Sequence, residues 1–480
     1  MSSGSLSAPS SAPALSTAGE AEAARAPRRL WRENIEALSM AVVMALFLKH
    51  FMVEVYKIPT GSMQPTLIGD EQAGIQDRIV VDKLTYLARA PARWEVAVFR
   101  YPLDRSKSFV KRIVGVGPEE LSIRFGDLWH RVEGGDWEIL RRPRSVQAAT
   151  WKRLDRDEPG TSPWIAQGLP QSSRWKAEGR RIEARGTGTA AFRGGHESIV
   201  DGYLDGYPPA LLGWIPDHPV DSGQDPVGDL RVAGTVRAQP GLEVFVVVLK
   251  EGQRHYRIEL PRPAAAENAE ARIDAGPSAR TRAPTALPYR LPANESVHFA
   301  AQNLDDRLEL ELDGEVVLGV DIQPAEDQTS AVLLTLEGEG ADLADLGVWR
   351  DIYYIEQSSE PVVVPADSFY MLGDNTQNSS DSREWMLARF EVAVPDDGAH
   401  VVSGYSRQGD NPRTVFADTG TLTTFVDEWG ERHWFAQAEA RQLEPMPAPF
   451  VPREMIQGKA LAVLWPLDPV RDIWRLKWVN

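Results

Sequence analysis

Residues 308–320 read Leu-Glu-Leu-Glu-Leu-Asp-Gly-Glu-Val-Val-Leu-Gly-Val, and this stretch indicates the fold class most directly. Apolar residues recur at every second position on both sides of Asp313-Gly314, which is the strongest short-range signal for a β-hairpin. Other short apolar runs, bounded by turn residues, are typical of strands: 78–82, 94–99, 109–114, 244–249 and 256–260. The chain is therefore predicted to be mostly β.

The composition excludes several classes of protein. The chain has 480 residues and a formal net charge of −17, from 69 acidic and 52 basic residues. A nucleic-acid-binding protein normally carries a basic face, so we expect no nucleic acid as a partner. There is no cysteine, and the eight histidines have no metal-ligand spacing, so the sequence predicts no disulfide, no metal and no cofactor.

The N-terminal region predicts a membrane anchor. Residues 1–32 are expected to form a flexible cytoplasmic tail, because the first 24 are rich in Ser, Ala, Pro and Gly. An apolar run from Ala37 to Leu48, extended on both sides, predicts a transmembrane helix over 33–54. Four arginines precede the run, so the positive-inside rule places the tail in the cytoplasm and the rest of the chain outside. A cleaved signal peptide is the alternative, but no small-x-small site follows the run.

Two segments offer a nucleophile and a base. Residues 58–67, Ile-Pro-Thr-Gly-Ser-Met-Gln-Pro-Thr-Leu, hold Ser62 on a loop that two prolines stiffen; the alternative is a simple turn. Strand 109–114 places Lys111 on the same face as Phe109 and Ile113. Burial between apolar neighbours lowers the pKa of a lysine and makes its amine a base. The alternative for Lys111 is an edge-strand lysine that reaches water.

A third segment is dense in turn-forming and hydroxyl residues. It spans residues 373–385 and reads Gly-Asp-Asn-Thr-Gln-Asn-Ser-Ser-Asp-Ser-Arg-Glu-Trp. Taken alone, it is compatible with a solvated loop before a short helix, in which Asp381 and Glu384 act as a capping pair.

Together and in this order, the three segments resemble the motifs of type I signal peptidases. That family carries a Pro-Ser/Thr-Gly-Ser-Met-x-Pro-Thr-Leu box after a membrane anchor, a Lys-Arg-x-Val-Gly strand and a Gly-Asp-Asn-x-x-x-Ser-x-Asp-Ser-Arg box. Strand 94–102 and a closing segment around Gly458 and Trp465 add to the likeness. The resemblance covers roughly 30–130, 350–390 and 448–480, which is under half of the chain.

The resemblance implies roles for individual residues. Ser62 would be the nucleophile and Lys111 the general base of a Ser–Lys dyad, an arrangement that needs no histidine. The Ser62 N–H and the Thr60 hydroxyl would form the oxyanion hole, and Ser379 would form a hydrogen bond with Lys111 and orient it. Other residues would hold the site together or line small substrate pockets: the ion pair Asp381 and Arg383, and the lining residues Tyr56, Ile58, Pro59, Phe109 and Val110.

The spacing of the motifs implies two insertions in the peptidase. The predicted divisions are a tail (1–32), a transmembrane helix (33–54), a β-sheet peptidase core in three parts (55–127, 351–390 and 448–480), an inserted β-sandwich-like domain (128–350) and a second insertion (391–447). We interpret the inserted domain as a structural or interaction module. Its likeness to carbohydrate-binding sandwiches is one of fold alone.

The function that the resemblance implies is cleavage of N-terminal signal peptides after small residues at Ala-x-Ala sites. The expected partners are the signal peptides of exported preproteins, the lipid bilayer of the cell membrane and the secretion translocon. Two alternatives remain open. One is a membrane-tethered binding module with a relic peptidase core, and the other is a self-cleaving regulatory Ser–Lys peptidase.

Overall fold

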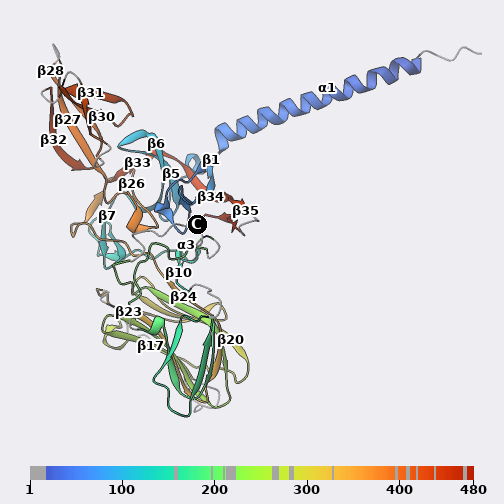
Figure 1. Ribbon diagram of the computed structural model, residues 1–480, viewed down its shortest axis with the longest axis vertical. Coiled ribbons are helices and arrows are strands. Elements are labelled where there is room, and N and C mark those ends of the chain that lie inside the picture. Colours follow the sequence, from blue (N-terminus) through green and yellow to red (C-terminus); the bar gives the residue numbers. More distant parts are fainter. Residues whose placement is uncertain are drawn as a thin grey trace, which may run out of the picture. The chain divides into compact units, whose positions relative to one another are not determined.

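A computed structural model gives the fold (Figure 1). It describes residues 18–155, 161–195, 198–208, 211, 223–261, 270–280, 286–326, 329–394, 398–406, 411–417, 420–436, 439–468 and 473–479. The chain divides into two compact units, Met1–Glu54 and Val55–Asn480. Strands dominate the second unit, which confirms the prediction of a mostly β protein.

The first unit is helical. Helix α1 spans Ala18–Phe47 and continues as a π-helical turn, η1, over Leu48–Met52. The helix thus begins well before the predicted boundary at 32–33, because residues 18–32 are rich in Ala, Glu and Arg, which are strong helix formers. Within the described residues, none of the helices combines the length and the apolar character needed to span a bilayer. The predicted tail over 1–17 lies outside the described residues.

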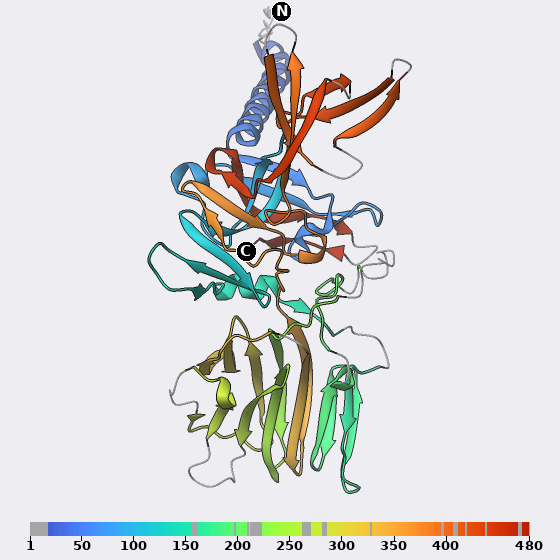
Figure 2. The same ribbon diagram turned by 90° about the vertical axis from the view of Figure 1, so that its left-hand side faces the viewer.

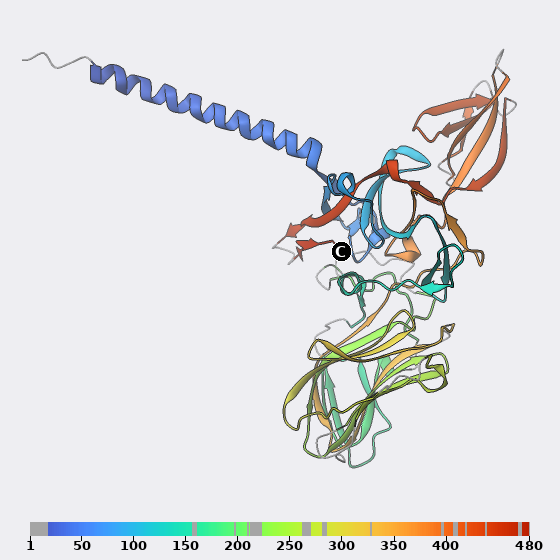
Figure 3. The same ribbon diagram turned by 180° about the vertical axis from the view of Figure 1, so that it is seen from behind.

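The main sheet of the second unit unites strands from distant parts of the sequence. Its order is β1-β4-β34-β5-β6-β26-β33, with β37 paired to β34. Segments near residues 55–115, 370 and 450–478 therefore share one sheet (Figure 3). The strands are β1 (Val53–Lys57), β4 (Arg78–Asp82), β5 (Val96–Tyr101), β6 (Asp104–Val116), β26 (Ser368–Leu372), β33 (Phe450–Pro452), β34 (Ile456–Trp465) and β37 (Lys477–Trp478).

Smaller elements surround this sheet. They comprise the sheet β25 (Val362–Val364), β7 (Glu119–Arg124), β8 (Asp127–Arg131) and β9 (Glu138–Ile139); the ribbons β2 (Gly69–Asp70) with β3 (Ile75–Gln76) and β35 (Leu467–Asp468) with β36 (Ile473–Trp474); and the helices α2 (Thr85–Ala88), α3 (Arg144–Thr150), η2 (Gly61–Met63), η5 (Thr376–Asn378) and η6 (Arg453–Met455).

Between residues 152 and 350, the described strands form a sandwich of two sheets (Figure 1). Both sheets contribute to one buried core, in which Phe245 of one sheet packs edge-to-face on Phe299 of the other at 4.9 Å. One sheet contains β10 (Lys152–Arg153), β12 (Arg174–Glu178), β13 (Arg181–Arg185), β15 (Leu230–Ala238), β20 (Ser296–Asn303), β21 (Arg307–Leu312), β22 (Glu315–Asp321) and β24 (Ala341–Arg350). The other contains β11 (Trp164–Gln167), β14 (Gly188–Phe192), β16 (Leu242–Glu251), β17 (Arg254–Pro261), β18 (Ala271–Asp274), β19 (Ala286–Leu287) and β23 (Ser330–Gly338). The short turns η3 (Arg193–Gly195) and η4 (Gly276–Ser278) belong to the same region.

The hairpin predicted at 308–320 is present as β21 and β22. Asp313 and Gly314 both have positive φ, 49° and 88°, as the tight turn requires. A bulge shifts the register between Leu310 and Glu311, so that Val316 faces solvent although it was expected on the apolar side.

The predicted second insertion contains β-ribbons with a small core of their own (Figure 2). Strands β28-β27-β32 form one sheet and β29-β30-β31 another. Phe390, Phe425 and Phe435 pack between them. The strands are β27 (Met386–Val394), β28 (Gly398–Tyr405), β29 (Arg413–Ala417), β30 (Gly420–Val426), β31 (Arg432–Ala436) and β32 (Ala440–Pro447).

Candidate active site

Ser62 and Lys111 meet beside the main sheet. Ser62 lies in the 3₁₀ turn η2, and Lys111 lies on β6 opposite Ala97 of β5. Lys111 Nζ donates a hydrogen bond to Ser62 Oγ over 2.7 Å. The lysine is only 3% exposed, whereas Ser62 is half-buried. The structure therefore brings together the two residues in which the sequence predicted a nucleophile and a base.

The environment of Lys111 changes its protonation. Burial lowers the pKa of Lys111 to about 8, and the nearby charges of Asp381 and Arg383 act in opposite directions. This shift has the direction expected from the apolar neighbours of the lysine. At neutral pH a fraction of about one tenth of the amine is then uncharged and able to accept a proton.

Strand β26 brings the third segment to Ser62. Leu372 pairs with Arg112 of β6, so the turn that follows β26 lies next to the lysine strand. The backbone N–H of Asn375 donates to the carbonyl oxygen of Ser62 at 3.1 Å. A Cβ atom at Gly373 would lie 2.4 Å from that same carbonyl oxygen, so only glycine fits this close approach.

A buried ion pair lies one residue from Lys111. Arg112 Nε and Nη2 donate to the two carboxylate oxygens of Asp374 at 2.8 and 2.7 Å, and Thr66 Oγ1 donates to the same carboxylate. Burial alone would raise the pKa of Asp374, but the charge and hydrogen bonds of Arg112 hold it below its usual value. The sequence analysis missed this pair, although both residues lie inside the quoted motifs.

One of the two contacts predicted for the remaining residues of the third segment is formed, and the other is not. Arg383 Nε and Nη2 donate to the carboxylate of Asp381 at 2.8 and 2.9 Å, so the predicted pair is in contact. The Ser379 hydroxyl, by contrast, is buried without a hydrogen-bond partner in the described part of the chain. It occupies the space that a side chain at Gly373 would fill, and the predicted hydrogen bond from Ser379 to Lys111 is not formed.

The predicted oxyanion-hole residues lie at the start of η2. Thr60 is exposed and extended, and in the described structure its side chain makes no capping hydrogen bond to the turn. Ser62 lies in the first turn of η2, where backbone N–H groups have no acceptor within the helix.

The predicted pocket residues divide between two clusters. Tyr56, Ile58 and Val110 belong to one apolar cluster, together with Met63 of the nucleophile turn. Phe109 belongs to another and stacks on Tyr101 at 4.3 Å between ring centroids. Successive strand residues face opposite sides of a sheet, so Phe109 and Val110 cannot line the same wall. Pro59, the remaining member of the set, is exposed.

Residues of the inserted region also reach the nucleophile turn. Asn378 Nδ2 donates to the hydroxyl of Tyr203 at 3.3 Å, and a Cβ atom at Gly61 would lie 2.6 Å from the same hydroxyl. Tyr207 packs in a buried cluster with Ile68 and Ile75. No local pattern predicts these contacts, because they join segments more than 100 residues apart.

A β-rich fold with a buried lysine hydrogen-bonded to a serine on a proline-flanked turn defines a serine-hydrolase type of site. The segment that carries both Ser62 and Lys111 matches a known family. Residues 31–141 match the family described as "Signal peptidase, peptidase S26". This segment is therefore related to the type I signal peptidases, which confirms the resemblance seen in the motifs.

Individual relatives agree with this assignment. The chain is 33% identical over 109 residues to "Probable signal peptidase I-2" of Synechocystis sp., covering 22% of this chain and 47% of the relative. It is 35% identical over 86 residues to signal peptidase I of Aquifex aeolicus (18% and 31% covered) and 39% identical over 83 residues to that of Pseudomonas fluorescens (15% and 27% covered). The chain thus spans less than half the length of each of these relatives.

Among solved structures, a carbohydrate-binding module of Bacillus subtilis matches 38% of this chain and 95% of its own, at 10% identity and a TM-score of 0.22. A likeness at this level supports no statement about what the chain binds.

Proposed function

We propose that the chain is a membrane-associated serine endopeptidase that removes N-terminal signal peptides from exported preproteins, cutting after small residues at Ala-x-Ala sites. Ser62 is the nucleophile and Lys111 the general base. The observation that carries this proposal is the 2.7 Å contact between Lys111 Nζ and Ser62 Oγ, made by a lysine that burial keeps partly neutral. The relatives named signal peptidase I support the substrate class.

The reaction proceeds in two steps. Neutral Lys111 accepts the hydroxyl proton of Ser62 while Oγ attacks the scissile carbonyl carbon, and the resulting ammonium then protonates the leaving amine as the C–N bond breaks. In the second step Lys111 takes a proton from water, the hydroxide attacks the acyl ester, and Ser62 recovers its proton as the cleaved signal peptide leaves. No histidine, metal or cofactor takes part in this scheme.

The start of η2 provides donors for the oxyanion that forms on the carbonyl oxygen. In this proposal they are the Ser62 N–H, which has no acceptor within the turn, and the Thr60 hydroxyl, which does not cap it. Ser379 orients Lys111 only once substrate is bound, because its hydroxyl has no partner in the described structure. The buried pair of Asp381 and Arg383 keeps the third segment in place.

Substrate specificity is assigned to the apolar cluster next to Ser62. Tyr56, Ile58 and Val110 pack with Met63 beside the nucleophile, and in this proposal they form the pockets that accept small side chains. An extended substrate adds backbone hydrogen bonds along the neighbouring strands.

Two exposed apolar surfaces support location at a membrane. The described side chains of α1, from Trp31 to Phe47, are all exposed, including the part of the predicted apolar run that lies in this helix. In the second unit, exposed apolar residues gather near β34, β36 and β37: Trp465 (46% exposed), Trp474 (64%), Leu476 (67%) and Trp478 (75%). Aromatic residues of this kind favour the membrane–water interface. We place the N-terminus in the cytoplasm and the catalytic unit outside, near the translocon.

The test is cleavage of a preprotein with an Ala-x-Ala site by the full chain in detergent micelles. We expect wild type to cut after the second alanine, and Ser62→Ala and Lys111→Met to lose at least about a thousandfold in rate. Lys107→Met is the matched control, because Lys107 lies on the same strand but is exposed and paired with Asp104; it should cut like wild type.

Other results would contradict the proposal. A folded wild type that is inert on several such preproteins would favour the binding-module alternative, and cleavage confined to the chain itself would favour the regulatory peptidase. Extraction of cell membranes with alkaline carbonate tests the anchor separately: an integral protein stays in the pellet, whereas release into the supernatant would overturn the transmembrane helix.

A further inference from the structure

Three carboxylates that take no part in the candidate active site converge at one place. Asp127 begins β8, Asp229 directly precedes β15, and Asp305 lies in the turn between β20 and β21. One carboxylate oxygen from each lies within 4.8 Å of the other two. Asp127 and Asp229 are half-buried and Asp305 is buried, so the cluster is partly shielded from water.

Two buried oxygen atoms at this place lack hydrogen-bond partners among the described residues. They are Oδ2 of Asp305 and Oδ1 of Asn303, both on side chains that are 3% exposed. Asn303 Nδ2 donates to the carbonyl of Gly228, which directs its amide to the residue next to Asp229. A buried carboxylate oxygen without a donor is costly, so an unpartnered one within a cluster of three acids points to a bound cation.

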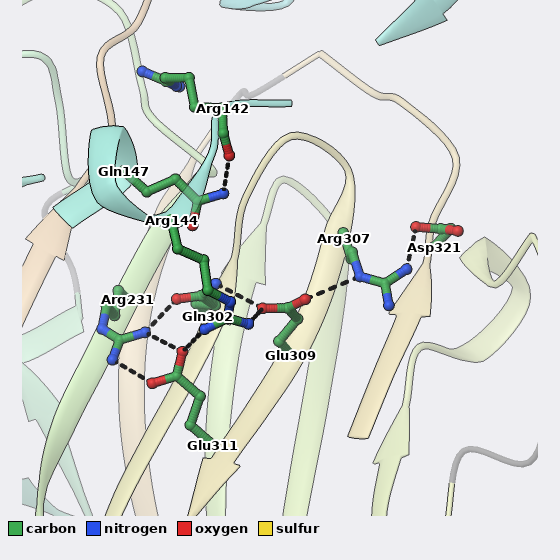
Figure 4. A network of polar contacts seen from close by, with 9 residues as sticks. All are labelled: Arg142, Arg144, Gln147, Arg231, Gln302, Arg307, Glu309, Glu311 and Asp321. Atoms are coloured by element: carbon green, nitrogen blue, oxygen red, sulfur yellow. Dashed lines mark hydrogen bonds and ion pairs between the residues drawn. The ribbon is translucent and has the colours of Figure 1, made fainter. Parts of the chain in front are cut away.

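Arginines neutralise three acidic residues of the neighbouring strands, Glu309, Glu311 and Asp321. Figure 4 shows arginines paired with each of them: Arg144 and Arg231 with Glu311, Arg144 and Arg307 with Glu309, and Arg307 with Asp321. At the cluster, the Arg141 guanidinium donates to the backbone carbonyl of Asp305 at 3.2 Å, and the carboxylate of Asp305 has one long ion pair with Arg142. Arg142 Nη2 is 3.5 Å from Asp305 Oδ1 but lies much closer to the carboxylate of Asp351.

We infer that Asp127, Asp229 and Asp305 form a site for a divalent cation, most suitably Ca²⁺. Two oxygens bound to one Ca²⁺ at 2.3–2.6 Å lie no more than about 5 Å apart, and the three carboxylates already meet this limit. The ligands are oxygens alone, which disfavours zinc. Carboxylates from three separate chain segments form a site of loose geometry, which suits Ca²⁺ better than the strict octahedron of Mg²⁺.

The cation would join the peptidase core to the inserted sandwich. Asp127 belongs to the β7–β8 hairpin, whereas Asp229 and Asp305 belong to the sheet that contains β15, β20 and β21. Asp305 N donates to Asp229 Oδ2 at 2.9 Å, which fixes two of the ligands relative to each other before any ion binds. Binding then stabilises the folded chain, because the unfolded chain has no such site.

The test measures binding and stability, not activity. Full-length protein, freed of metal with a chelator, is titrated with CaCl₂ and separately with MgCl₂ by calorimetry, and its Tm is followed in both. We expect one Ca²⁺ site with a Kd on the order of 10⁻⁴–10⁻³ M, a rise in Tm of a few degrees, and a weaker response to Mg²⁺. Asp127→Asn and Asp305→Asn should each weaken Ca²⁺ binding at least tenfold.

The stability of the metal-free variants and a control variant distinguish a cation site from a structural role. Without metal, Asp127→Asn should be at least as stable as wild type, because the substitution removes repulsion between carboxylates; a merely structural role would make it less stable. Asp427→Asn is the control, since Asp427 belongs to another acidic group but already accepts hydrogen bonds from His433 and two backbone N–H groups. No response of wild type to about 10 mM Ca²⁺, or an unchanged response in both cluster variants, would overturn the inference.

Discussion

Arg112 and Asp374 form a bidentate ion pair at 2.8 and 2.7 Å, and neither side chain is exposed. The pair joins β6, one residue after Lys111, to the turn that also holds the carbonyl of Ser62. Thr66, on the loop that follows Ser62, donates to the same carboxylate. One buried acid therefore connects the three segments that carry the candidate active site.

Loss of this acid should destabilise the whole protein. Asp374→Asn leaves the Arg112 charge buried without its counter-ion, which costs about 3–5 kcal/mol. The free energy of unfolding in denaturant measures the effect. Glu391→Gln is the control, because the pair of Glu391 with Arg441 is exposed and should contribute less than about 1 kcal/mol. Equal losses in the two variants would show that burial of the Arg112 pair has no special weight.

The rate of cleavage should depend on the pKa of Lys111. Only the neutral amine accepts the Ser62 proton, and the pKa of Lys111 is about 8, so kcat/KM should rise about tenfold per pH unit below pH 8 and level off above it. The measurement is kcat/KM on a preprotein from about pH 6 to about pH 9. Lys107→Met should keep this profile, whereas a flat profile in wild type would remove Lys111 from the role of base.

The same pKa has a consequence for stability. Burial lowers the pKa of Lys111 from 10.5 to about 8, so between these values the unfolded chain binds more protons and the stability of wild type rises with pH. Below pH 8 the buried ammonium costs free energy. Lys111→Met should therefore be more stable than wild type at pH 7, by about 1–3 kcal/mol, and this advantage should shrink as pH rises above 8. Thermal unfolding of both proteins at pH 7 and pH 10 measures it.

Sequence patterns predicted what depends on neighbouring residues. The Asp313-Gly314 hairpin, the strand around Lys111 and the loop around Ser62 follow from alternation and turn chemistry within a few residues. The pair of Arg112 and Asp374 joins positions 262 residues apart, which no local pattern specifies. Alternation along β6 already separated Phe109 from Val110, and the pocket implied by the family resemblance placed them together against that rule. The early start of α1 followed from helix propensity, which the search for an apolar span did not weigh.

Two neighbouring serines should respond in opposite ways to replacement by alanine. The Ser379 hydroxyl is buried without a partner in the described structure, so Ser379→Ala should change stability by less than about 1 kcal/mol. If it orients Lys111 in the substrate complex, kcat should fall about tenfold or more. The Ser382 hydroxyl accepts the Met371 N–H at 2.9 Å, so Ser382→Ala should cost about 1–3 kcal/mol of stability. A Ser379→Ala enzyme with unchanged kcat would remove that residue from the site.

The inserted region should influence the nucleophile turn through Tyr203. An added methyl in Gly61→Ala would lie 2.6 Å from the Tyr203 hydroxyl and from Gln64 Oε1, so the turn must shift. A displacement of this size lowers kcat/KM by up to about a hundredfold. Tyr203→Phe alone removes the 3.3 Å hydrogen bond with Asn378 and should lower the rate less than Gly61→Ala does, but added to Gly61→Ala it relieves one of the two clashes. Cleavage kinetics of the four proteins form a double-mutant cycle, in which the double variant should be at least about threefold faster than Gly61→Ala. A double variant no faster than the single one would mean that the contact with the inserted region does not set the position of Ser62.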